Sequence, residues 1–151
     1  MHFHILVGTT SGNTEYLADA LSERLAALDY TATLHDQPEF TEIPTGNAAN
    51  PAHWLLCMAT HGAGEYAESI IGFMETLTAT QPDLSAVKVA IIAIGDSSYD
   101  TFCKAGIDAE AIILELNAQL LAPTLTIDML NELDPEANAI SWLNQWIETY
   151  T

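Results

Sequence analysis

Basic side chains are nearly missing from this sequence of 151 residues, in which Arg24, Lys88 and Lys104 are set against 21 acidic residues. The formal net charge at pH 7 is −18. Such a field repels nucleic acid and anionic membrane surfaces, so neither is expected as a partner. It also attracts a protein with a basic face during encounter. An adaptation for solubility or salt accounts for the same composition, and both interpretations stay open at this point.

Cysteine and long apolar runs are scarce as well. Cys57 and Cys103 are the only cysteines, and their spacing matches neither a metal site nor a Cys-x-x-Cys motif. We expect both thiols to be reduced, as is usual in the cytosol. The apolar runs are too short to cross a bilayer, and the first residues lack the basic start of a secretory signal. The sequence therefore predicts one cytoplasmic domain over residues 1–151.

Short apolar runs alternate with helical patterns along the chain. The runs lie at residues 3–7, 31–34, 54–59, 87–94 and 125–127. The third and fourth are continuously apolar, which is typical of strands buried on both faces of a parallel sheet. Helical patterns lie at residues 13–28, 69–78, 108–121 and 135–150. The alternation predicts an α/β doubly wound fold, with helices on both faces of a five-stranded parallel sheet in the order 2-1-3-4-5.

A turn rich in glycine and hydroxyl groups follows the first run, with the sequence Gly8-Thr9-Thr10-Ser11-Gly12-Asn13-Thr14-Glu15. It leads directly into a helical pattern, where unpaired N–H groups and the helix dipole favour an anion. The turn has no lysine, which excludes the nucleoside-triphosphate loop, and the dinucleotide fingerprint Gly-x-Gly-x-x-Gly is missing too. It predicts a small phosphate bound by backbone and hydroxyl donors alone. An ordinary hydroxyl-capped turn is the alternative.

Two more polar loops follow the third and fourth runs. Their sequences are Ala59-Thr60-His61-Gly62-Ala63-Gly64-Glu65-Tyr66 and Ile94-Gly95-Asp96-Ser97-Ser98-Tyr99-Asp100-Thr101-Phe102-Cys103. Glycines after a buried strand mark backbone that turns sharply or lies close to a ligand. The carboxyl ends of parallel strands meet at one edge of a sheet, so His61 and Tyr99 are expected beside the phosphate turn. That arrangement suits a planar ring held between two loops.

These three loops resemble the three FMN-binding loops of the flavodoxin family. The resemblance spans the whole chain. It is to the short-chain flavodoxins, because the fifth predicted strand leads to the last helix without the insertion of the long-chain members. The motifs Thr60-His61-Gly62-Ala63-Gly64 and Tyr99-Asp100-Thr101-Phe102-Cys103 look most like the MioC-type branch of the family. The resemblance implies a flavodoxin-like fold and the cofactor FMN.

The resemblance also implies a role for each loop. Backbone and hydroxyl groups of the first loop would bind the phosphate, from Thr9, Thr10, Ser11, Gly12, Asn13 and Thr14. Asn13 and Thr60 would reach the ribityl chain. His61 would cover the inner face of the flavin ring, and Tyr99 would stack on the outer face. The carbonyl of Gly62 would turn toward flavin N5 once N5 carries a hydrogen, and glycine suits such a change of backbone conformation.

The pyrimidine edge of the ring would be bound by backbone groups of Asp96, Thr101 and Cys103. The other cofactor-binding positions that the resemblance implies are Ala63, Gly64, Gly95 and Phe102. Two departures from the family pattern predict weaker FMN binding. His61 stands where many flavodoxins have Trp or Tyr, and Ala59 stands where some relatives have another phosphate-binding hydroxyl.

The expected function is that of a low-potential, one-electron carrier, a monomer and not an enzyme with its own substrate. The flavin would carry the chemistry, and no acid–base pair, nucleophile–His arrangement or metal cluster in the sequence indicates catalysis. A flavin-containing NADPH reductase would be the donor. The acceptor would have a basic docking face, and the MioC resemblance implies an iron–sulfur or radical enzyme such as biotin synthase.

Other functions are compatible with parts of the same sequence. An FMN-dependent NAD(P)H oxidoreductase acting on quinones or similar small acceptors stays open, as does a flavodoxin-like chain that has lost its flavin. A phosphoacceptor receiver domain is excluded, because Gly8-Thr9 and Thr60-His61 stand where its acidic residues are needed. The other histidines are interpreted as structural or solvated, since His2, His4, His35 and His53 show no metal-ligand spacing.

Overall fold

A computed structural model describes residues 1–10 and 12–150, without the side chain of Asn13. The longer strands are β1 (His2–Gly8), β2 (Thr31–His35), β3 (Ala52–His61) and β5 (Val87–Gly95), and the shorter ones are β4 (Glu65–Tyr66), β6 (Gln119–Leu120) and β7 (Leu125–Asp128). The α-helices are α1 (Asn13–Ala27), α2 (Ile71–Thr80), α3 (Lys104–Glu115) and α4 (Pro135–Tyr150). Two 3₁₀ turns, η1 (Phe40–Glu42) and η2 (Glu68–Ile70), complete the regular structure.

The predicted α/β fold and strand order are confirmed. The main strands are parallel and follow the order β2-β1-β3-β5-β6, and β7 also pairs with β5. The fifth predicted strand, residues 125–127, corresponds to β7. The sequence did not predict β6, because Gln119 and Leu120 lie within the predicted helix over residues 108–121. The sequence did not predict β4, a short antiparallel strand that pairs with the end of β3.

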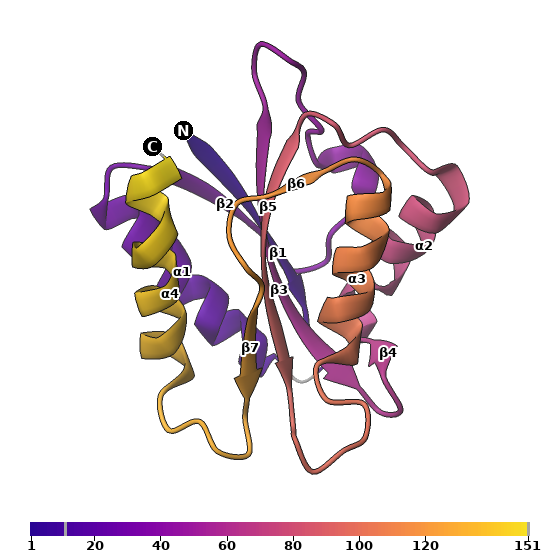
Figure 1. The fold of residues 1–151 in the computed structure, drawn as a ribbon, viewed down its shortest axis with the longest axis vertical. Helices are drawn as coiled ribbons and strands as arrows, with labels where there is room; N and C mark the ends of the chain where they lie inside the picture. Colours follow the sequence, from indigo (N-terminus) through magenta and orange to yellow (C-terminus); the bar gives the residue numbers. More distant parts are fainter. Residues whose placement is uncertain (11, 151) are drawn as a thin grey trace.

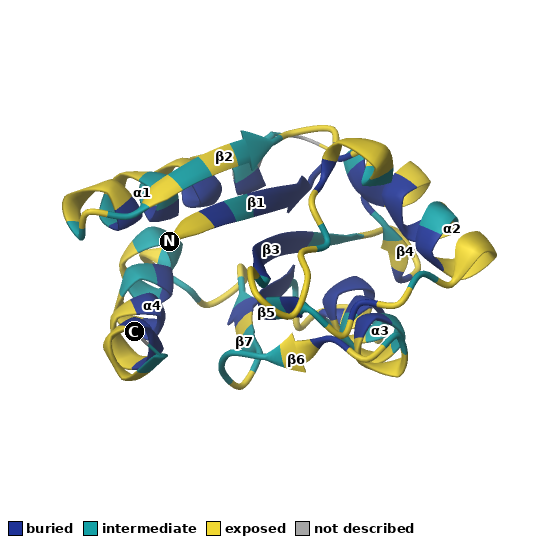
Figure 2. Ribbon diagram, turned by 90° about the horizontal axis from the view of Figure 1, so that it is seen from above, coloured by how far each residue is buried: buried dark blue, intermediate teal, exposed yellow. Residues whose placement is uncertain are grey.

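Two layers of helices enclose the sheet, with α1 and α4 on one face and α2 and α3 on the other (Figure 1). The alternation of side chains along a strand divides β1 between two cores. Phe3, Ile5 and Val7 pack toward α1 and α4, whereas Leu6 belongs to the core that contains Phe73 of α2. Burial is concentrated in the central strands β1, β3 and β5 and on the inner sides of the helices, whereas the edge strands β2 and β6 are more exposed (Figure 2). In the described part of the chain, no helix is long and apolar enough to cross a membrane.

The predicted helix over residues 108–121 is wrong at both ends. The structure places α3 at Lys104–Glu115, followed by a strand that contains Leu120. Asn117 has a φ of 82°, a left-handed conformation that commonly ends a helix. Leu120 matches the helical period in the sequence, but it pairs with Val89 of β5. The predicted helix over residues 69–78 is shifted as well, because η2 precedes α2 (Ile71–Thr80).

Candidate functional site

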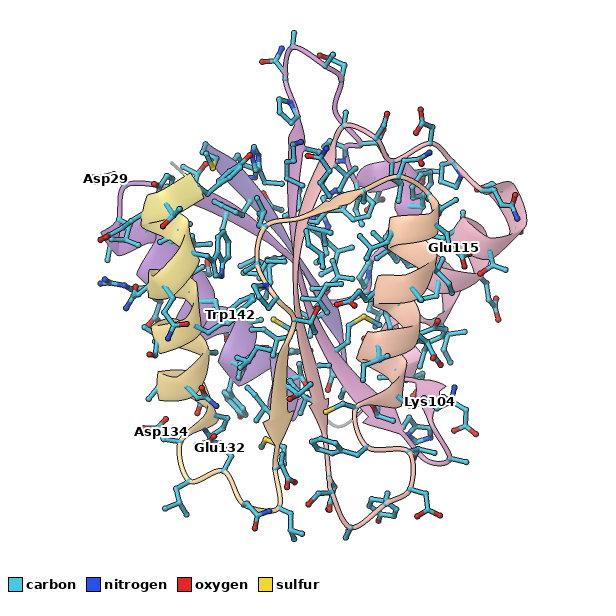
Figure 3. The ribbon with its side chains drawn as sticks, in the orientation of Figure 1. Asp29, Lys104, Glu115, Glu132, Asp134 and Trp142 are labelled. Carbon is cyan, nitrogen blue, oxygen red and sulfur yellow. The ribbon has the colours of Figure 1, made fainter. Side chains whose placement is uncertain are left out.

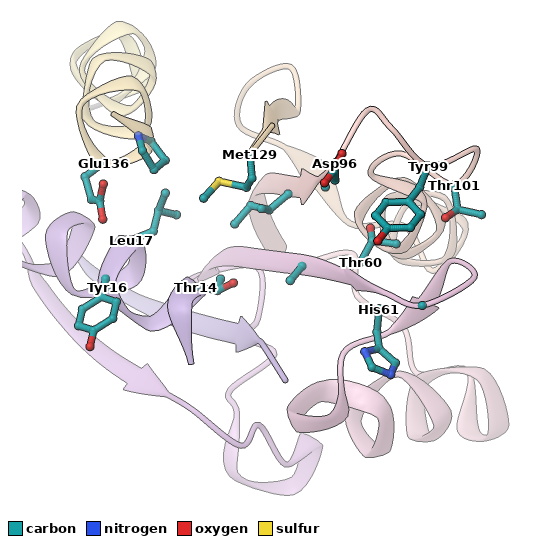
Figure 4. Close-up of a pocket in the computed structure, with 15 residues that line it drawn as sticks. Thr14, Tyr16, Leu17, Thr60, His61, Asp96, Tyr99, Thr101, Met129 and Glu136 are labelled. Atoms are coloured by element: carbon teal, nitrogen blue, oxygen red, sulfur yellow. The ribbon is translucent and has the colours of Figure 1, made fainter. Parts of the chain in front are cut away.

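A cavity of about 570 Å³ opens at the carboxyl ends of the central strands (Figure 4). This volume is within the range of small-molecule sites, roughly 300–1,000 Å³. All three predicted loops contribute to its wall. The predicted residues that line it are Thr14, Thr60, His61, Gly62, Gly95, Asp96, Tyr99 and Thr101. His61 and Tyr99 lie in different loops on the same cavity, as the sequence predicted.

The rest of the wall was not predicted as a site. It is formed by Tyr16, Leu17, Ala59, Ile94, Met129, Pro135 and Glu136. Met129, Pro135 and Glu136 belong to the connection from β7 to α4 and to the start of α4. The end of the fifth predicted strand was a signal for them, because it lies at the same edge of the parallel sheet as the other carboxyl ends.

The first loop is held from behind by Ser69 of η2. The backbone N–H of Thr9 donates a hydrogen bond to Ser69 Oγ at 2.8 Å, and the Ser69 hydroxyl donates to the carbonyl of Val7 at 2.8 Å. The N–H of Ser69 donates in turn to the carbonyl of Thr9 at 3.3 Å. One serine therefore fixes the backbone on both sides of Gly8. Nothing in the local sequence around Ser69 indicates this role, since it depends on contacts across 60 residues of sequence.

Other contacts of the first loop divide it into a supporting part and an exposed part. Thr9 is buried, and its hydroxyl accepts a hydrogen bond from the N–H of Gly12 at 2.9 Å. Gly12 has a φ of 88° and directly precedes α1. Thr10 is exposed, and its hydroxyl lies 3.5 Å from Nδ1 of His61. The predicted contacts of Ser11, and of the Asn13 side chain, lie outside the described residues.

The second loop forms a tight hairpin between β3 and β4. Opposite residues are His61 and Glu65, and the N–H of Gly64 donates to the carbonyl of His61 at 3.0 Å. Gly62 and Gly64 have φ values of 52° and 103°, in the region that favours glycine. Ala63 is exposed between them. The two glycines thus give the chain the reversal that brings β4 back along β3.

The third loop is shaped by two carboxylates. Asp96 Oδ1 accepts hydrogen bonds from the N–H and the hydroxyl of Ser98, at 2.8 and 2.6 Å. Asp128, at the end of β7, accepts the N–H of Ser97 at 3.0 Å. Hydrogen bonds, above all from Ser97, lower the pKa of Asp128. Tyr99 is presented to solvent above this turn, with 63% of its surface exposed.

Cys103 lies beneath the third loop and not on the cavity wall. It is fully buried, with a φ of 56°, and its thiol donates to the carbonyl of Ala93 at 3.2 Å. Burial raises the pKa of this thiol to about 11, so it is neutral near pH 7. A Cβ added at Gly95 would lie 2.5 Å from the backbone nitrogen of Cys103. Glycine at position 95 therefore allows the third loop to pack directly on the end of β5.

A hydroxyl also connects the second and third loops. Thr60 Oγ1 accepts a hydrogen bond at 3.2 Å from the N–H of Ala105, in the first turn of α3. The oxygen thus satisfies a helix N–H that has no partner within the helix. Gly64 packs nearby, since a Cβ added there would lie 3.2 Å from Thr101 Cβ. Phe102 is half-buried next to Thr101, outside the residues that line the cavity.

The cavity wall is acidic. Asp96 and Glu136 line it, whereas Lys104 forms an ion pair with Asp108 at the start of α3. Within residues 1–10 and 12–150, no group of three or more His, Cys, Asp or Glu side chains is arranged to hold a metal ion. Among the described residues that line the cavity there is no Lys or Arg, so the donors to an anion there are backbone N–H groups, hydroxyls and the His61 ring.

The family model that describes flavodoxins matches residues 5–142 of this sequence. The chain belongs to the flavodoxin family. It is 36% identical to a MioC homolog of Haemophilus influenzae, in an alignment of 148 residues that covers 98% of both chains. It is also 33% identical to the flavoprotein alpha-component of an NADPH sulfite reductase of a Shewanella species, over 91% of this chain and 22% of that protein. A solved Pseudomonas aeruginosa flavodoxin, a cysteine-to-serine mutant, matches with a TM-score of 0.84 and 25% identity, over 96% and 95% of the two chains. Family membership indicates FMN as the cofactor.

Proposed function

We propose that this flavodoxin is a low-potential, one-electron carrier that binds FMN at the cavity between its three loops. The observation that supports it best is the meeting of three separate glycine- and hydroxyl-rich strand ends at one cavity. A strand-to-helix turn alone has a purely structural explanation. Three such loops converging on a space of ligand size favour a single bound molecule with several chemical parts.

The described part of the first loop fits a phosphate bound without a cation. It leads into α1, whose first N–H groups have no intrahelical partner and carry the positive end of the helix dipole. Thr14 is buried and lines the cavity in that first turn. The basic residue of this helix is Arg24, which lies in the last turn, at the opposite end from the first loop. Its Nε–H donates a hydrogen bond to Asn144 Oδ1 at 3.0 Å. We assign phosphate binding to Thr9, Thr10, Gly12 and Thr14, together with Ser11 and Asn13.

The second and third loops fit a planar ring. We assign the inner face to His61 and the outer face to Tyr99, whose exposed ring is free to stack. Backbone groups of Asp96, Thr101 and Cys103 are assigned to the pyrimidine edge. We assign to the Gly62 carbonyl a hydrogen bond from flavin N5–H, since glycine at a φ of 52° can exchange backbone conformations at little cost.

When bound, FMN supplies one-electron redox chemistry. The contribution of the chain is to orient the ring and to set the electrostatic field around it. Asp96 and Glu136 on the cavity wall make additional negative charge there unfavourable, and the net charge of −18 acts in the same direction. We therefore expect a low potential for the step that adds the second electron. The Gly62 carbonyl would favour the first step by holding a proton at N5.

The donor and acceptor are proposed from the charge and from the resemblance. A flavin-containing NADPH reductase is the proposed donor, which the likeness to an NADPH sulfite reductase flavoprotein supports. The proposed acceptor is an enzyme with a basic docking face, of the iron–sulfur or radical class that includes biotin synthase. We further propose that the chain acts as a monomeric single domain. The cytoplasm is the proposed compartment, because both cysteines are free and buried.

The test is an anaerobic titration of the protein with FMN, followed by measurement of both one-electron potentials. We expect binding that shifts the visible flavin bands, and two potentials that are well separated, the second far below that of free FMN. A single two-electron step would count against a carrier. NAD(P)H oxidation without an added reductase would support the alternative, an FMN-dependent NAD(P)H oxidoreductase. No binding in excess FMN would rule out the proposal.

A further inference from the structure

The connection from β7 to α4 presents apolar side chains to solvent. Met129, Leu130 and Leu133 are 46%, 57% and 99% exposed. The segment between β7 and α4 therefore keeps large hydrophobic groups in water next to a ligand-sized cavity. Exposed apolar groups that gather beside a site are typical of surfaces that contact another molecule.

Residues 129–134, between β7 and α4, are called the apolar loop below. Hydrogen bonds to Asp128 fix its first part. The carboxylate accepts the N–H of Leu130 at 3.1 Å and the side-chain amide of Asn131 at 2.7 Å. The same carboxylate bonds Ser97 in the third loop, so the apolar loop and the third loop are tied together. The carbonyl of Gly95 accepts the N–H of Met129 at 2.8 Å, which adds a backbone link to β5. The exposure of Leu130 thus occurs on a well-supported backbone.

Glu132 and Asp134 fix the second part, at the start of α4 (Figure 3). Glu132 Oε1 accepts the N–H of Asp134 at 3.1 Å, and its Oε2 accepts the side-chain amide of Asn138 at 2.9 Å. Asp134 Oδ1 caps α4 by accepting the N–H of Ala137 at 3.0 Å. Leu133 lies between these two carboxylates. Because its backbone is already ordered, a partner that buries Leu133 loses little conformational entropy in the loop.

The apolar loop lies at the mouth of the cavity. Met129 lines the cavity on the side of α4, with Pro135 and Glu136, and Tyr99 lines it from the third loop. In Figure 1 the loops after β5 and β7 project from the same end of the molecule. A protein that approaches a molecule in the cavity at this end therefore meets the apolar loop and Tyr99 together.

Charge determines which kind of protein fits this surface. The loop and its neighbours carry carboxylates at Asp96, Asp100, Asp128, Glu132, Asp134 and Glu136. Residues 105–151 contain no Lys or Arg. A second copy of this chain would bring two such surfaces together and is repelled. A basic rim around an apolar centre complements the surface in both charge and polarity.

We propose that Leu130 and Leu133 form the apolar contact of a docking surface for the electron-transfer partner, a protein whose matching face is apolar at its centre and basic at its rim. This rests on the proposed carrier function. Leucine burial contributes a part of the binding free energy that does not depend on salt. The surrounding carboxylates contribute the part that does. The apolar loop therefore affects which basic protein binds productively, beyond the attraction that any basic protein experiences.

The test compares Leu130→Ser, Leu133→Ser and the double variant with Leu114→Ser. Leu114 is 37% exposed near the far end of α3, so it is a matched control for the loss of an exposed leucine. The probe is a purified FAD-containing NADPH reductase of the kind that reduces flavodoxins. Its steady-state rate is measured against the concentration of the FMN-loaded protein, at low and high salt. FMN affinity and both potentials are measured on every variant.

We expect the KM for the double variant to rise about tenfold, with kcat, FMN affinity and potentials unchanged. The dependence of KM on salt should keep its slope, because no charge is removed. An Asp100→Asn variant should reduce that slope instead.

If the double variant behaves like Leu114→Ser while the wild type accepts electrons, the docking assignment is overturned and the carrier function stands. A wild type that binds no FMN or accepts no electrons would overturn both. Sedimentation that shows a wild-type dimer abolished in the double variant would assign the loop to self-association and overturn the proposal.

Discussion

The two ends of the parallel sheet both carry a cavity, but they are constructed in different ways. At the carboxyl end, about 570 Å³ is enclosed by loops in which glycines bring backbone segments into contact. At the amino end, about 400 Å³ lies beside Met1, His2, His4 and His53, with the connection that precedes β3. The carboxyl end keeps hydroxyl and N–H groups near an open space. The amino end bonds its polar side chains to one another.

Imidazole and hydroxyl groups at the amino end join β1 to β2. The two ring nitrogens of His2 lie 2.6 Å and 2.8 Å from the hydroxyls of Thr31 and Thr33. Nδ1 of His4 lies 3.0 Å from Nε2 of His35. These groups satisfy each other across the edge of the sheet. Cavity volume alone is therefore a poor guide to function, and the hydrogen bonding of the polar groups around a cavity is a better one.

The largest effect is expected from closing the space at Gly95. In Gly95→Ala the new Cβ would lie 2.5 Å from the backbone nitrogen of Cys103, and backbone cannot rotate away as a side chain can. We expect the third loop to shift and FMN affinity to fall about tenfold to a hundredfold, the equivalent of roughly 1–3 kcal/mol of overpacking. Isothermal titration with FMN measures this directly.

Gly72→Ala is the matched control, since no atom lies within 4 Å of its added Cβ in α2. This variant should bind FMN normally and should be more stable than the wild type by about 0.5–1 kcal/mol. Equal FMN affinity in the Gly95 and Gly72 variants would mean that the backbone at the carboxyl end of the sheet is not rigid around the FMN site.

The second effect concerns the support behind the first loop. Ser69→Ala removes the partner of the Thr9 N–H and of the Val7 carbonyl. We expect the free energy of unfolding to fall by about 1–3 kcal/mol. FMN affinity should fall more than riboflavin affinity, because only FMN carries the phosphate. If both ligands lose affinity by the same factor, Ser69 does not act through the phosphate loop.

At the amino end the expected effect is on stability and its dependence on pH. Burial, followed by the positive charge of His2 and His35, lowers the pKa of His4 from 6.5 to about 4. Burial also lowers the pKa of His35, although Glu42 and Asp36 oppose this. The folded state therefore favours neutral imidazoles, and the unfolded chain takes up protons first. This contribution to stability is fully present above pH 6.5 and is lost as the pH falls toward 4.

We expect a loss of about 1–2 kcal/mol between pH 7 and pH 4.5, after allowance for solvent screening of half-buried groups. Urea unfolding of the FMN-free protein at several pH values measures it. His4→Gln should remove most of this dependence and leave FMN affinity at pH 7 unchanged. A change in FMN affinity in this variant would show that the two ends of the sheet are coupled and that the histidines are not a purely structural group.

The sequence predicted features that depend on local chemistry and on strand order. The loops containing Thr60 and Tyr99 could be placed on one edge because parallel strands share a direction. Features that depend on register could not be predicted. The register of β1 and β2 sets Leu6 opposite His35. His4 lies two residues before Leu6, on the same face of the sheet, and therefore meets the His35 side chain. Ser69 meets Thr9 through the packing of η2. The C-terminal end of α3 was predicted too late for a local reason. The apolar period in the sequence continues to Leu120, but the left-handed conformation of Asn117 stops the helix before it.

The smallest expected effect separates the two walls of the carboxyl-end cavity. Tyr99 and Tyr16 both line it, and they are similarly exposed, at 63% and 68%. If the ring lies between the second and third loops, Tyr99→Ala loses a stacking contact worth about 0.5–1.5 kcal/mol. FMN affinity should then fall roughly twofold to tenfold. Tyr16→Ala should leave it nearly unchanged, because α1 would contact the phosphate end only. The reverse result would place the ring between α1 and the start of α4, beside Met129 and Glu136. It would assign the glycine loops to structure and not to flavin binding.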